Sequence, residues 1–354
     1  MLHRRSGLPK RAAIAAARLS STARLPLLTE AEALSRWRAA LPPATATSIL
    51  AGYSSLLGGI VTDPALLMVP LDDHGFHRGH AVFDTCNVED GHAFGLTMHI
   101  DRLMSSARKA RIIADRDSIE PVELRSIVLQ TIAATGRRDG VFVRYWLTAG
   151  RGDFSISPKA CVGGPSFFCV AHEDTHTAAE PRGLRAAFVD VPVKPPLLAV
   201  MKSNNYMLNA LVAMHAEAAG AQLGIQVTSE GGRTLLAESS VSTVAIVDEQ
   251  GVLRTPPADA ILPSTTWSRA VALAPALVER GILSGCEVNP IAPAEVVRAR
   301  EILSMGGGWV EPVVELDGQP IGGGQPGPVF RMLDELVRAD FRNPLLTDKV
   351  PYAS

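Results

Sequence analysis

A polar segment at residues 172–182 lacks the apolar periodicity of a helix or a strand and divides the sequence into two halves. In both halves, apolar runs of strand length alternate with amphipathic stretches of helix length. The chain has 354 residues, which is more than one hydrophobic core usually fills. These patterns predict an α/β fold of two domains, a small N-terminal domain at 46–171 and a larger C-terminal domain at 183–340, joined by a linker at 172–182.

The individual elements follow from the same patterns. Strands are predicted at 66–71, 81–88, 141–147, 167–170, 184–193, 224–228, 243–247 and 252–255. Helices are predicted at 98–112, 121–135, 209–219 and 266–280. The glycine triplets at 306–308 and 322–324 lack the strand and helix context of a dinucleotide-binding loop, so they are interpreted as turns.

The first 29 residues contain six basic residues and no acid, whereas the whole chain has a net charge of −2. Arginine-rich, serine-containing segments without acids are typical of organelle transit peptides. The sequence therefore predicts a transit peptide at 1–29, addressed to a plastid or a mitochondrion. A disordered basic tail is the alternative interpretation.

Composition narrows the class of ligand. The 34 basic and 36 acidic residues nearly balance, and no basic block interleaves with aromatic residues as in a nucleic-acid surface. The four cysteines form no C-x-x-C pair, which argues against a disulfide framework and a cysteine zinc site. No apolar run approaches the roughly 18 residues that span a bilayer. We expect a small-molecule ligand, and neither nucleic acid nor a membrane as a partner.

Lys202 is the candidate catalytic residue. Five of the six lysines stand in basic or polar settings that suggest solvated surface, but Lys202 follows the apolar run at 197–201, interpreted as a strand. A polar turn and a helix start come next. Apolar surroundings disfavour the ammonium form of a lysine, and the neutral amine can form a Schiff base with a carbonyl.

Further motifs stand around Lys202 in a fixed order. They are D-H-G-F-H-R-G-H-A-V-F-D-T at 73–85, H-I-D-R-L at 99–103, K-S-N-N-Y at 202–206, A-E-S-S at 237–240, I-L-P-S-T-T at 261–266 and E-P-V-V-E-L-D-G at 311–318. In order and spacing they resemble the class IV (fold-type IV) pyridoxal-phosphate-dependent aminotransferase family over about residues 66–337. The resemblance implies a homodimeric enzyme that uses pyridoxal 5'-phosphate (PLP).

The resemblance also implies a role for each matching residue. Lys202 matches the lysine that holds PLP as a Schiff base (an aldimine) and then moves the substrate α-proton. Glu238 matches the acid beside the pyridine nitrogen, where a carboxylate keeps the ring protonated. The cofactor-binding residues are then completed by Arg102 for the phosphate, Thr265 and Thr266 for the same phosphate at a helix start, and Tyr206 for the phenolate.

Substrate selection rests on Phe83, Thr85, Arg144 and Arg151. Either arginine is suited to hold a substrate carboxylate, and Arg144 stands where branched-chain enzymes have an arginine. Thr85 resembles the threonine that aminodeoxychorismate lyases bring to the cofactor. As a whole the chain is most similar to plant and algal plastid members described as D-amino acid transaminases or aminodeoxychorismate lyases.

Three activities within the family stay open at this point. In this chain Asn205 stands three residues after Lys202, as in the D-amino acid and lyase subfamilies, whereas branched-chain enzymes have one more residue there. The favoured interpretation is transamination of a D-amino acid such as D-alanine or D-aspartate with a 2-oxo acid acceptor. The alternatives are 4-amino-4-deoxychorismate lyase, which releases 4-aminobenzoate, and branched-chain L-amino acid aminotransferase.

A rival from another class is a metal-binding hydrolase or module that uses His74, His77 and His80. Gly75 and Gly79 favour a turn at this place, from which the three histidines would diverge. The prediction is therefore that the chain holds no metal. His172 and His176 in the predicted linker are interpreted as exposed residues.

Overall fold

The computed structural model describes residues 24–113, 119–174, 183–257 and 261–353. The chain divides into two units, Met1–Pro42 and Pro43–Ser354. In the first unit, helix α1 (Glu30–Ala40) begins with a capping box, in which Thr29 Oγ1 accepts from the Glu32 N–H and Glu32 Oε2 accepts from the Thr29 N–H. Residues 1–23 of the predicted transit peptide lie outside the described residues.

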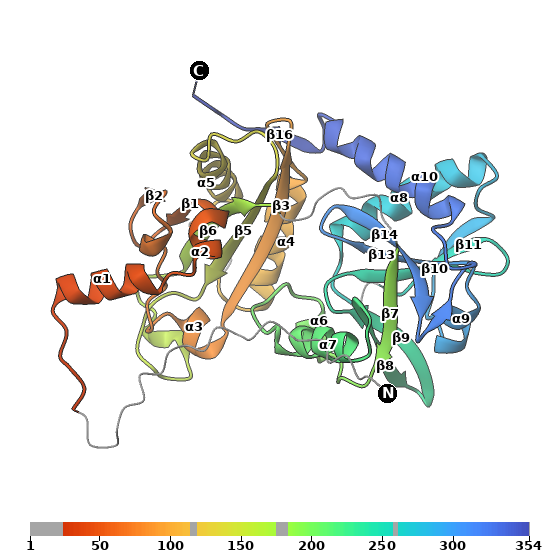
Figure 1. The fold of residues 1–354 in the computed structure, drawn as a ribbon, viewed down its shortest axis with the longest axis horizontal. Helices are drawn as coiled ribbons and strands as arrows, with labels where there is room; N and C mark the ends of the chain where they lie inside the picture. Colours follow the sequence, from red (N-terminus) through yellow and green to blue (C-terminus); the bar gives the residue numbers. More distant parts are fainter. Residues whose placement is uncertain (1–23, 114–118, 175–182, 258–260, 354) are drawn as a thin grey trace, which may run out of the picture. The chain divides into compact units, whose positions relative to one another are not determined.

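The second unit contains two sheets (Figure 1). The strands of the seven-stranded sheet, in spatial order, are β16 (Thr347–Lys349), β4 (His92–Phe94), β3 (Ala81–Glu89), β5 (Val141–Thr148), β6 (Ser166–Glu173), β1 (Ile49–Ser54) and β2 (Gly59–Val61). All these pairs are antiparallel. Strand β16 returns from beyond residue 340, where the predicted C-terminal domain ends, to join this sheet.

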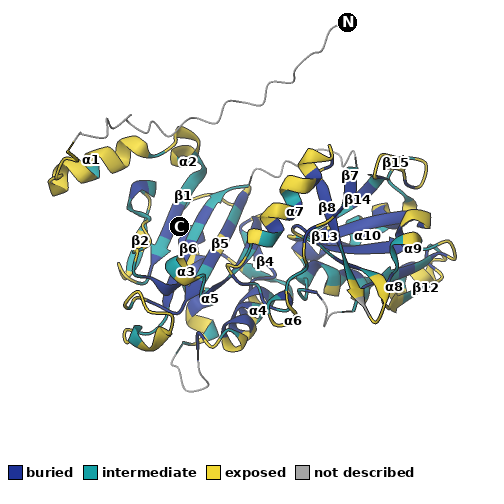
Figure 2. Ribbon diagram, turned by 90° about the horizontal axis from the view of Figure 1, so that it is seen from below, coloured by how far each residue is buried: buried dark blue, intermediate teal, exposed yellow. Residues whose placement is uncertain are grey.

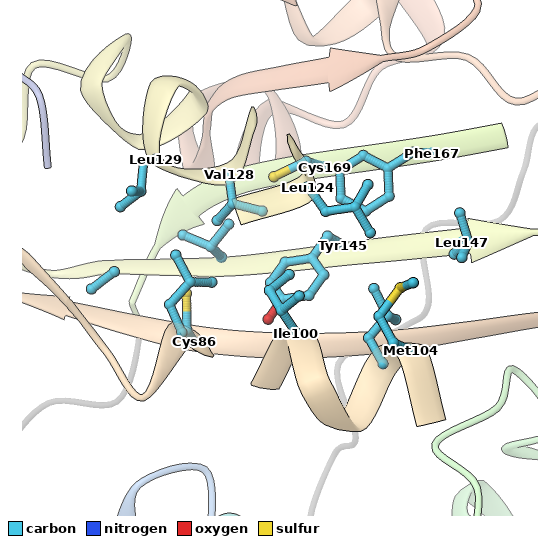
Figure 3. Packing of buried hydrophobic residues seen from close by; sticks show 14 of the residues in the cluster. Cys86, Ile100, Met104, Leu124, Val128, Leu129, Tyr145, Leu147, Phe167 and Cys169 are labelled. Carbon is cyan, nitrogen blue, oxygen red and sulfur yellow. The ribbon is translucent and has the colours of Figure 1, made fainter. Parts of the chain in front are cut away.

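Helices α4 (Leu96–Lys109) and α5 (Pro121–Ala133) pack on one face of this sheet (Figure 1). Strand β5 alternates, so that Val143, Tyr145 and Leu147 are buried in the core. Figure 3 shows Tyr145 and Leu147 packed with side chains of α4 and α5 such as Ile100 and Leu124. Phe142, Arg144 and Trp146 therefore lie on the opposite face. The short helices of this region are α2 (Pro43–Ser48), η1 (Pro64–Leu66), α3 (His74–Arg78) and η2 (Pro158–Ala160).

The second sheet has nine strands, eight along one path and β15 at the side. In spatial order they are β12 (Gly285–Val288), β11 (Val252–Thr255), β10 (Thr243–Val247), β13 (Glu301–Gly306), β14 (Trp309–Leu316), β7 (Leu184–Val189), β8 (Leu223–Glu230) and β9 (Arg233–Ser239), with β15 (Gln319–Pro320) paired to β14. The pairs β11–β12, β14–β7 and β7–β8 are parallel, and the other pairs are antiparallel.

Both faces of this sheet are covered at its centre, where β10 and β13 are buried at nearly every position (β13 in Figure 2). Ala245 and Val247 of β10 pack with helices α8 (Thr265–Glu279) and α10 (Pro328–Ala339). Val244 and Ile246, on the other face of the same strand, pack in a separate cluster that includes α9 (Pro293–Arg298). Such double coverage explains why β10 is a continuous apolar run. The remaining helices are α6 (Pro196–Ala199), α7 (Met207–Ala218) and η3 (Asp340–Arg342).

The loop that carries Lys202 is hydrogen-bonded to strand β3 of the first sheet. The Phe83 N–H donates to the Lys202 carbonyl at 2.8 Å, and the Asn204 N–H donates to the Ala81 carbonyl at 2.9 Å. Ser203 also forms an isolated β-bridge with Val82. These contacts hold the segment between α6 and α7 on the first sheet and fix the backbone of the candidate catalytic residue.

The predicted α/β class is confirmed, and three local predictions are wrong. The 66–71 run is not a strand, because a 3-10 helix that starts at Pro64 runs into it, Pro70 lies within it, and Leu67 packs tightly against Gly52. The apolar run before Lys202 is helical, since Pro196 begins the short helix α6. The predicted linker starts too early, because His172, which is only partly exposed, and Glu173 belong to β6; residues 175–182, with His176, lie outside the described residues.

Candidate active site

Lys202 lies in a small pocket of about 50 Å³ that takes side chains from both sheets. Six residues predicted to form the site line it, namely Thr85, Arg102, Lys202, Tyr206, Glu238 and Thr265. They come from β3, α4, the segment after α6, the residue that caps α7, β9 and the first turn of α8. The structure thus brings together residues that are up to 180 positions apart in the sequence.

The amine of Lys202 lies among aromatic rings and other cations. Its Nζ donates to Tyr206 Oη at 3.4 Å and lies 4.7 Å from the centroid of the Phe83 ring. Burial lowers the pKa of Lys202 to about 8, and the positive charge of Arg102 adds to this effect. A lysine with this pKa has a much larger fraction of neutral, nucleophilic amine at neutral pH than a solvated lysine has.

Arg102 is held by a buried carboxylate that sequence reasoning missed. Its Nε and Nη2 donate to Asp84 at 2.8 and 2.7 Å, and its Nη1 donates to the Pro263 carbonyl at 3.0 Å. His99 Nδ1 lies 3.1 Å from the same carboxylate. Burial alone would raise the pKa of Asp84, but Arg102 and His99 hold it well below its usual value. Asp84 therefore fixes the guanidinium at the pocket.

Glu238 closes the pocket on the side of β9. Its Oε1 accepts from the Leu262 N–H at 2.5 Å. Burial raises the pKa of Glu238, whereas this hydrogen bond and the charges of Lys194 and Lys202 lower it. The carboxylate is thus partly desolvated and faces two lysines.

Helix α8 begins at the pocket. Ser264 caps it by accepting from the Trp267 N–H at 3.2 Å, and Thr265 lines the pocket. The hydroxyl of Thr266 instead accepts from the Gly308 N–H at 2.9 Å, and Asn87 donates to the Gly307 carbonyl at 2.7 Å. Thr266 and Asn87 therefore hold the glycine turn whose Gly306 and Gly307 form a wall of the pocket.

Three of the four predicted substrate residues share one face of the first sheet. Thr85 pairs with Arg144 across the β3–β5 ladder, and Phe83 lies on the same face because strand residues two apart point the same way. The Arg144 Cζ is 5.8 Å from the Phe83 ring centroid. Within the described part of the chain, Arg144 has no ion-pair partner. Its guanidinium is thus available to an anionic ligand near Lys202.

Arg151, the fourth predicted substrate residue, is not brought into the pocket. Its guanidinium is exposed and makes a two-pronged ion pair with Asp72, with contacts of 2.9 to 3.1 Å. This ion pair and a β-bridge to Asp73 hold Arg151 on the surface of the N-terminal sheet region.

The histidine cluster differs from the predicted turn. His74 and His77 lie in helix α3, so the rings do not diverge, and the ring centroids of His77 and His80 are 5.0 and 5.3 Å from that of His74. His74 Nδ1 and His80 Nδ1 are 3.2 Å apart, and His80 Nε2 lies 2.7 Å from the Ala110 carbonyl oxygen. The described residues contain no group of three or more His, Cys, Asp or Glu side chains that could hold a metal ion.

Lys194 was wrongly predicted to be a solvated surface lysine. It is only partly exposed, and its Nζ lies 4.4 Å from the centroid of the Tyr206 ring. Lys194 and Glu238 both line a second cavity of about 650 Å³ beside the pocket. Burial lowers the pKa of Lys194, and the negative charge of Glu238 opposes this effect.

The donor set fits pyridoxal phosphate. A lysine with a pKa of about 8 is suited to bond the aldehyde, and Glu238 is suited to face a ring nitrogen. Arg102 and the N-terminus of the 15-residue helix α8 are suited to a phosphate. Four cations and two acids of the described residues act on one another around Lys202 and Glu238. The cations are Arg102, Arg144, Lys194 and Lys202, and the acids are Asp84 and Glu238. This excess of positive charge favours an anionic ligand.

Comparisons with known proteins agree with this chemistry. The family model for class IV amino-transferases matches residues 81–316. A chloroplastic D-amino-acid transaminase of Arabidopsis thaliana is 39% identical over 86% of this chain and 80% of its own length. A putative branched-chain-amino-acid aminotransferase of Methanocaldococcus jannaschii is 32% identical over 79% of this chain and 93% of its own length.

A solved structure shares the fold. The branched-chain amino acid aminotransferase of Thermobaculum terrenum, solved in its PLP-bound holo-form, has a TM-score of 0.72 at 21% identity and covers 86% of this chain and 99% of that one. The chain therefore belongs to the class IV aminotransferases, whose enzymes use PLP. Among the helices of the described residues, none has the length and apolarity needed to cross a membrane.

Proposed function

We propose that the enzyme transfers the amino group of a small D-amino acid, such as D-alanine or D-aspartate, to a 2-oxo acid. The observation that carries this proposal is the 39% identity to the chloroplastic D-amino-acid transaminase over 86% of the chain. The placement of Arg144 beside Phe83 and Lys202 supports it, because a transaminase must hold a substrate carboxylate close to the reacting amine.

In this proposal each pocket residue acts on a stated group. PLP, when bound, supplies the electron sink that stabilises a carbanion at the substrate α-carbon. Lys202 bonds the cofactor and moves the α-proton with its amine, and Glu238 holds a proton at the ring nitrogen. Arg102, Thr265 and the backbone N–H of Thr266 in the first turn of α8 hold the phosphate, whereas the Thr266 hydroxyl holds the glycine turn; Tyr206 donates to the phenolate.

Arg144 is proposed as the residue that holds the substrate carboxylate, and Arg151 provides a matched control. Replacing Arg144 by alanine should lower kcat/KM for the amino donor by about 10- to 100-fold, mainly through KM, because a charge-assisted hydrogen bond contributes about 1.5–3 kcal/mol. Arg151→Ala should change kcat/KM less than about threefold, since its guanidinium is already paired with Asp72. Steady-state kinetics would contradict the assignment if Arg151→Ala had the larger effect.

A lyase activity is the second candidate, because Thr85 lines the same pocket as Lys202. Purified enzyme should be assayed with D-alanine, L-leucine and aminodeoxychorismate. The proposal predicts amino transfer from D-alanine and little effect of Thr85→Val. Release of pyruvate and 4-aminobenzoate from aminodeoxychorismate, lost in Thr85→Val, would instead show a lyase. If L-leucine were the best donor, the enzyme would instead be a branched-chain aminotransferase, the activity for which the M. jannaschii relative is named.

We also propose that the enzyme is a homodimer in the plastid. Exposed apolar side chains, including Met68, Val69 and Phe76, border an apolar groove of about 480 Å³ on the N-terminal sheet region, which suits contact with a second copy. The plastid location is supported by the basic segment at 1–29 and by the chloroplastic relative. Light scattering of the purified protein would test the dimer, and a fluorescent fusion of residues 1–29 would test the location.

A further inference from the structure

Lys194 is a cation that the site described above leaves without a role. It stands between β7 and α6 and is followed by Pro195 and Pro196, which restrict the backbone after it. Its Nζ lies 4.4 Å from the Tyr206 ring centroid. Within the described residues no direct ion pair occupies the Lys194 ammonium, so its charge acts on the groups around it.

The acid that Lys194 faces is Glu238. Glu238 lies between the two cavities, with Lys202 in the smaller one and Lys194 in the larger one. The titratable groups that act on Glu238 are Lys194, Lys202 and Tyr206, and its remaining partner is the Leu262 N–H. Lys194 and Lys202 both favour the carboxylate, against the effect of burial.

The two lysines differ in what else they must do. Under the proposed function, the amine of Lys202 bonds the cofactor, so Lys202 does not act on Glu238 as a free ammonium group. Lys194 forms no such bond and keeps its ammonium group. We propose that Lys194 is a positioning residue of the active site, whose ammonium lies over the Tyr206 ring and acts by its charge on Glu238 across the cavity that both residues line. It thereby acts on the cofactor through Glu238 and Tyr206 rather than by contact.

The experiment compares Lys194→Met with Lys194→Arg in the PLP-loaded enzyme. Removing a nearby opposite charge raises the pKa of a carboxylate by about one unit or more. Lys194→Met should therefore shift the acid limb of kcat upward by about one pH unit, with KM for the amino donor nearly unchanged. The acid transition in the visible absorbance of the substrate-free holoenzyme should shift by the same amount. Lys194→Arg, which keeps the charge, should retain the wild-type pH profile.

Two controls separate this role from a merely structural one. Lys349→Met removes a positive charge from the one exposed residue of strand β16 and should leave the pH profile unchanged. In a Glu238→Gln background, Lys194→Met should cause no further shift, because the group that it acts on no longer titrates. If Lys194→Met folds poorly, Lys194→Gln provides the same charge removal with a polar side chain.

The outcomes distinguish this inference from the proposed function on which it rests. An unchanged acid limb in Lys194→Met, or a shift of equal size in Lys194→Arg, would overturn the role of Lys194. If Glu238→Gln changes neither the absorbance nor the turnover, the role that the proposed function gives to Glu238 is wrong, whatever the Lys194 variants show. A loss of thermal stability in Lys194→Met without any pH shift would show a structural residue only and would also overturn the inference.

Discussion

Replacing Glu238 by glutamine should slow removal of the substrate α-proton at least about a hundredfold, which corresponds to roughly 3 kcal/mol in the transition state. The amide keeps the shape of the side chain and leaves an oxygen for the Leu262 N–H. It cannot, however, act as the negative partner that holds a proton at the ring nitrogen. The measurement is the rate of deuterium exchange at the α-carbon of D-alanine, in solvent D₂O and with saturating cofactor.

The matched control is Glu287→Gln, which removes one negative charge from the exposed end of β12. Its exchange rate should equal that of the wild type. Cofactor should remain bound to the Glu238→Gln enzyme, because Arg102 and Lys202 are unchanged. Exchange at near the wild-type rate in Glu238→Gln would mean that this carboxylate does not face the ring.

The second large effect is expected on stability, at Asp84. Asp84→Asn leaves the partly buried Arg102 guanidinium without its fully buried counter-charge, and breaking a buried ion pair in this way costs about 3–5 kcal/mol. The free energy of unfolding should fall by this amount at pH 7 in urea titrations. The double variant Asp84→Asn with Arg102→Met should be less destabilised than the sum of the single variants, because the unpaired charge is gone.

The pH dependence of this difference has a definite sign. The folded-state pKa of Asp84 lies well below its unfolded value of about 3.9, so its contribution is complete above that pH and is lost as the pH falls further. The contribution of Asp84 to the difference in unfolding free energy between wild type and Asp84→Asn should thus be lost as the pH falls below about 4. A difference that did not shrink below about pH 4 would contradict the assignment of Asp84 as the ionised partner.

Local apolar patterns were enough to predict most of the fold. Strands β10 and β11 begin and end where predicted, and α8 differs from its prediction by one residue at each end. These segments are long or continuous apolar runs between clear turn residues. The 66–71 run was wrongly predicted to be a strand. Its apolar side chains pack against the core from an irregular segment, and the apolar pattern of the sequence does not distinguish such a segment from a strand. The return of β16 to the first sheet depends on long-range pairing that no local pattern encodes.

The residues proposed to contact the ligand could be predicted from the sequence. The residues that position other side chains were harder to predict. Lys202, Arg102 and Glu238 were found because they belong to motifs. Asp84 carried a signal that was overlooked: Val82, Cys86 and Val88 alternate on the buried face of β3, and a carboxylate in that row requires a cation. Lys194 gave no such signal, since its Nζ lies over the ring of Tyr206, on the far side of α6, and it lines a cavity together with residues of β9.

The central claim is that Lys202 carries the cofactor in this pocket. Purified holoenzyme should be treated with borohydride, which reduces the lysine–cofactor bond to a stable amine, then digested and analysed by mass spectrometry. We predict one pyridoxyl-modified peptide, which contains Lys202, and a yellow enzyme that loses its colour on reduction. A modified peptide that contains Lys109, Lys159, Lys194 or Lys349 instead, or a colourless protein that takes up no pyridoxal phosphate, would contradict it.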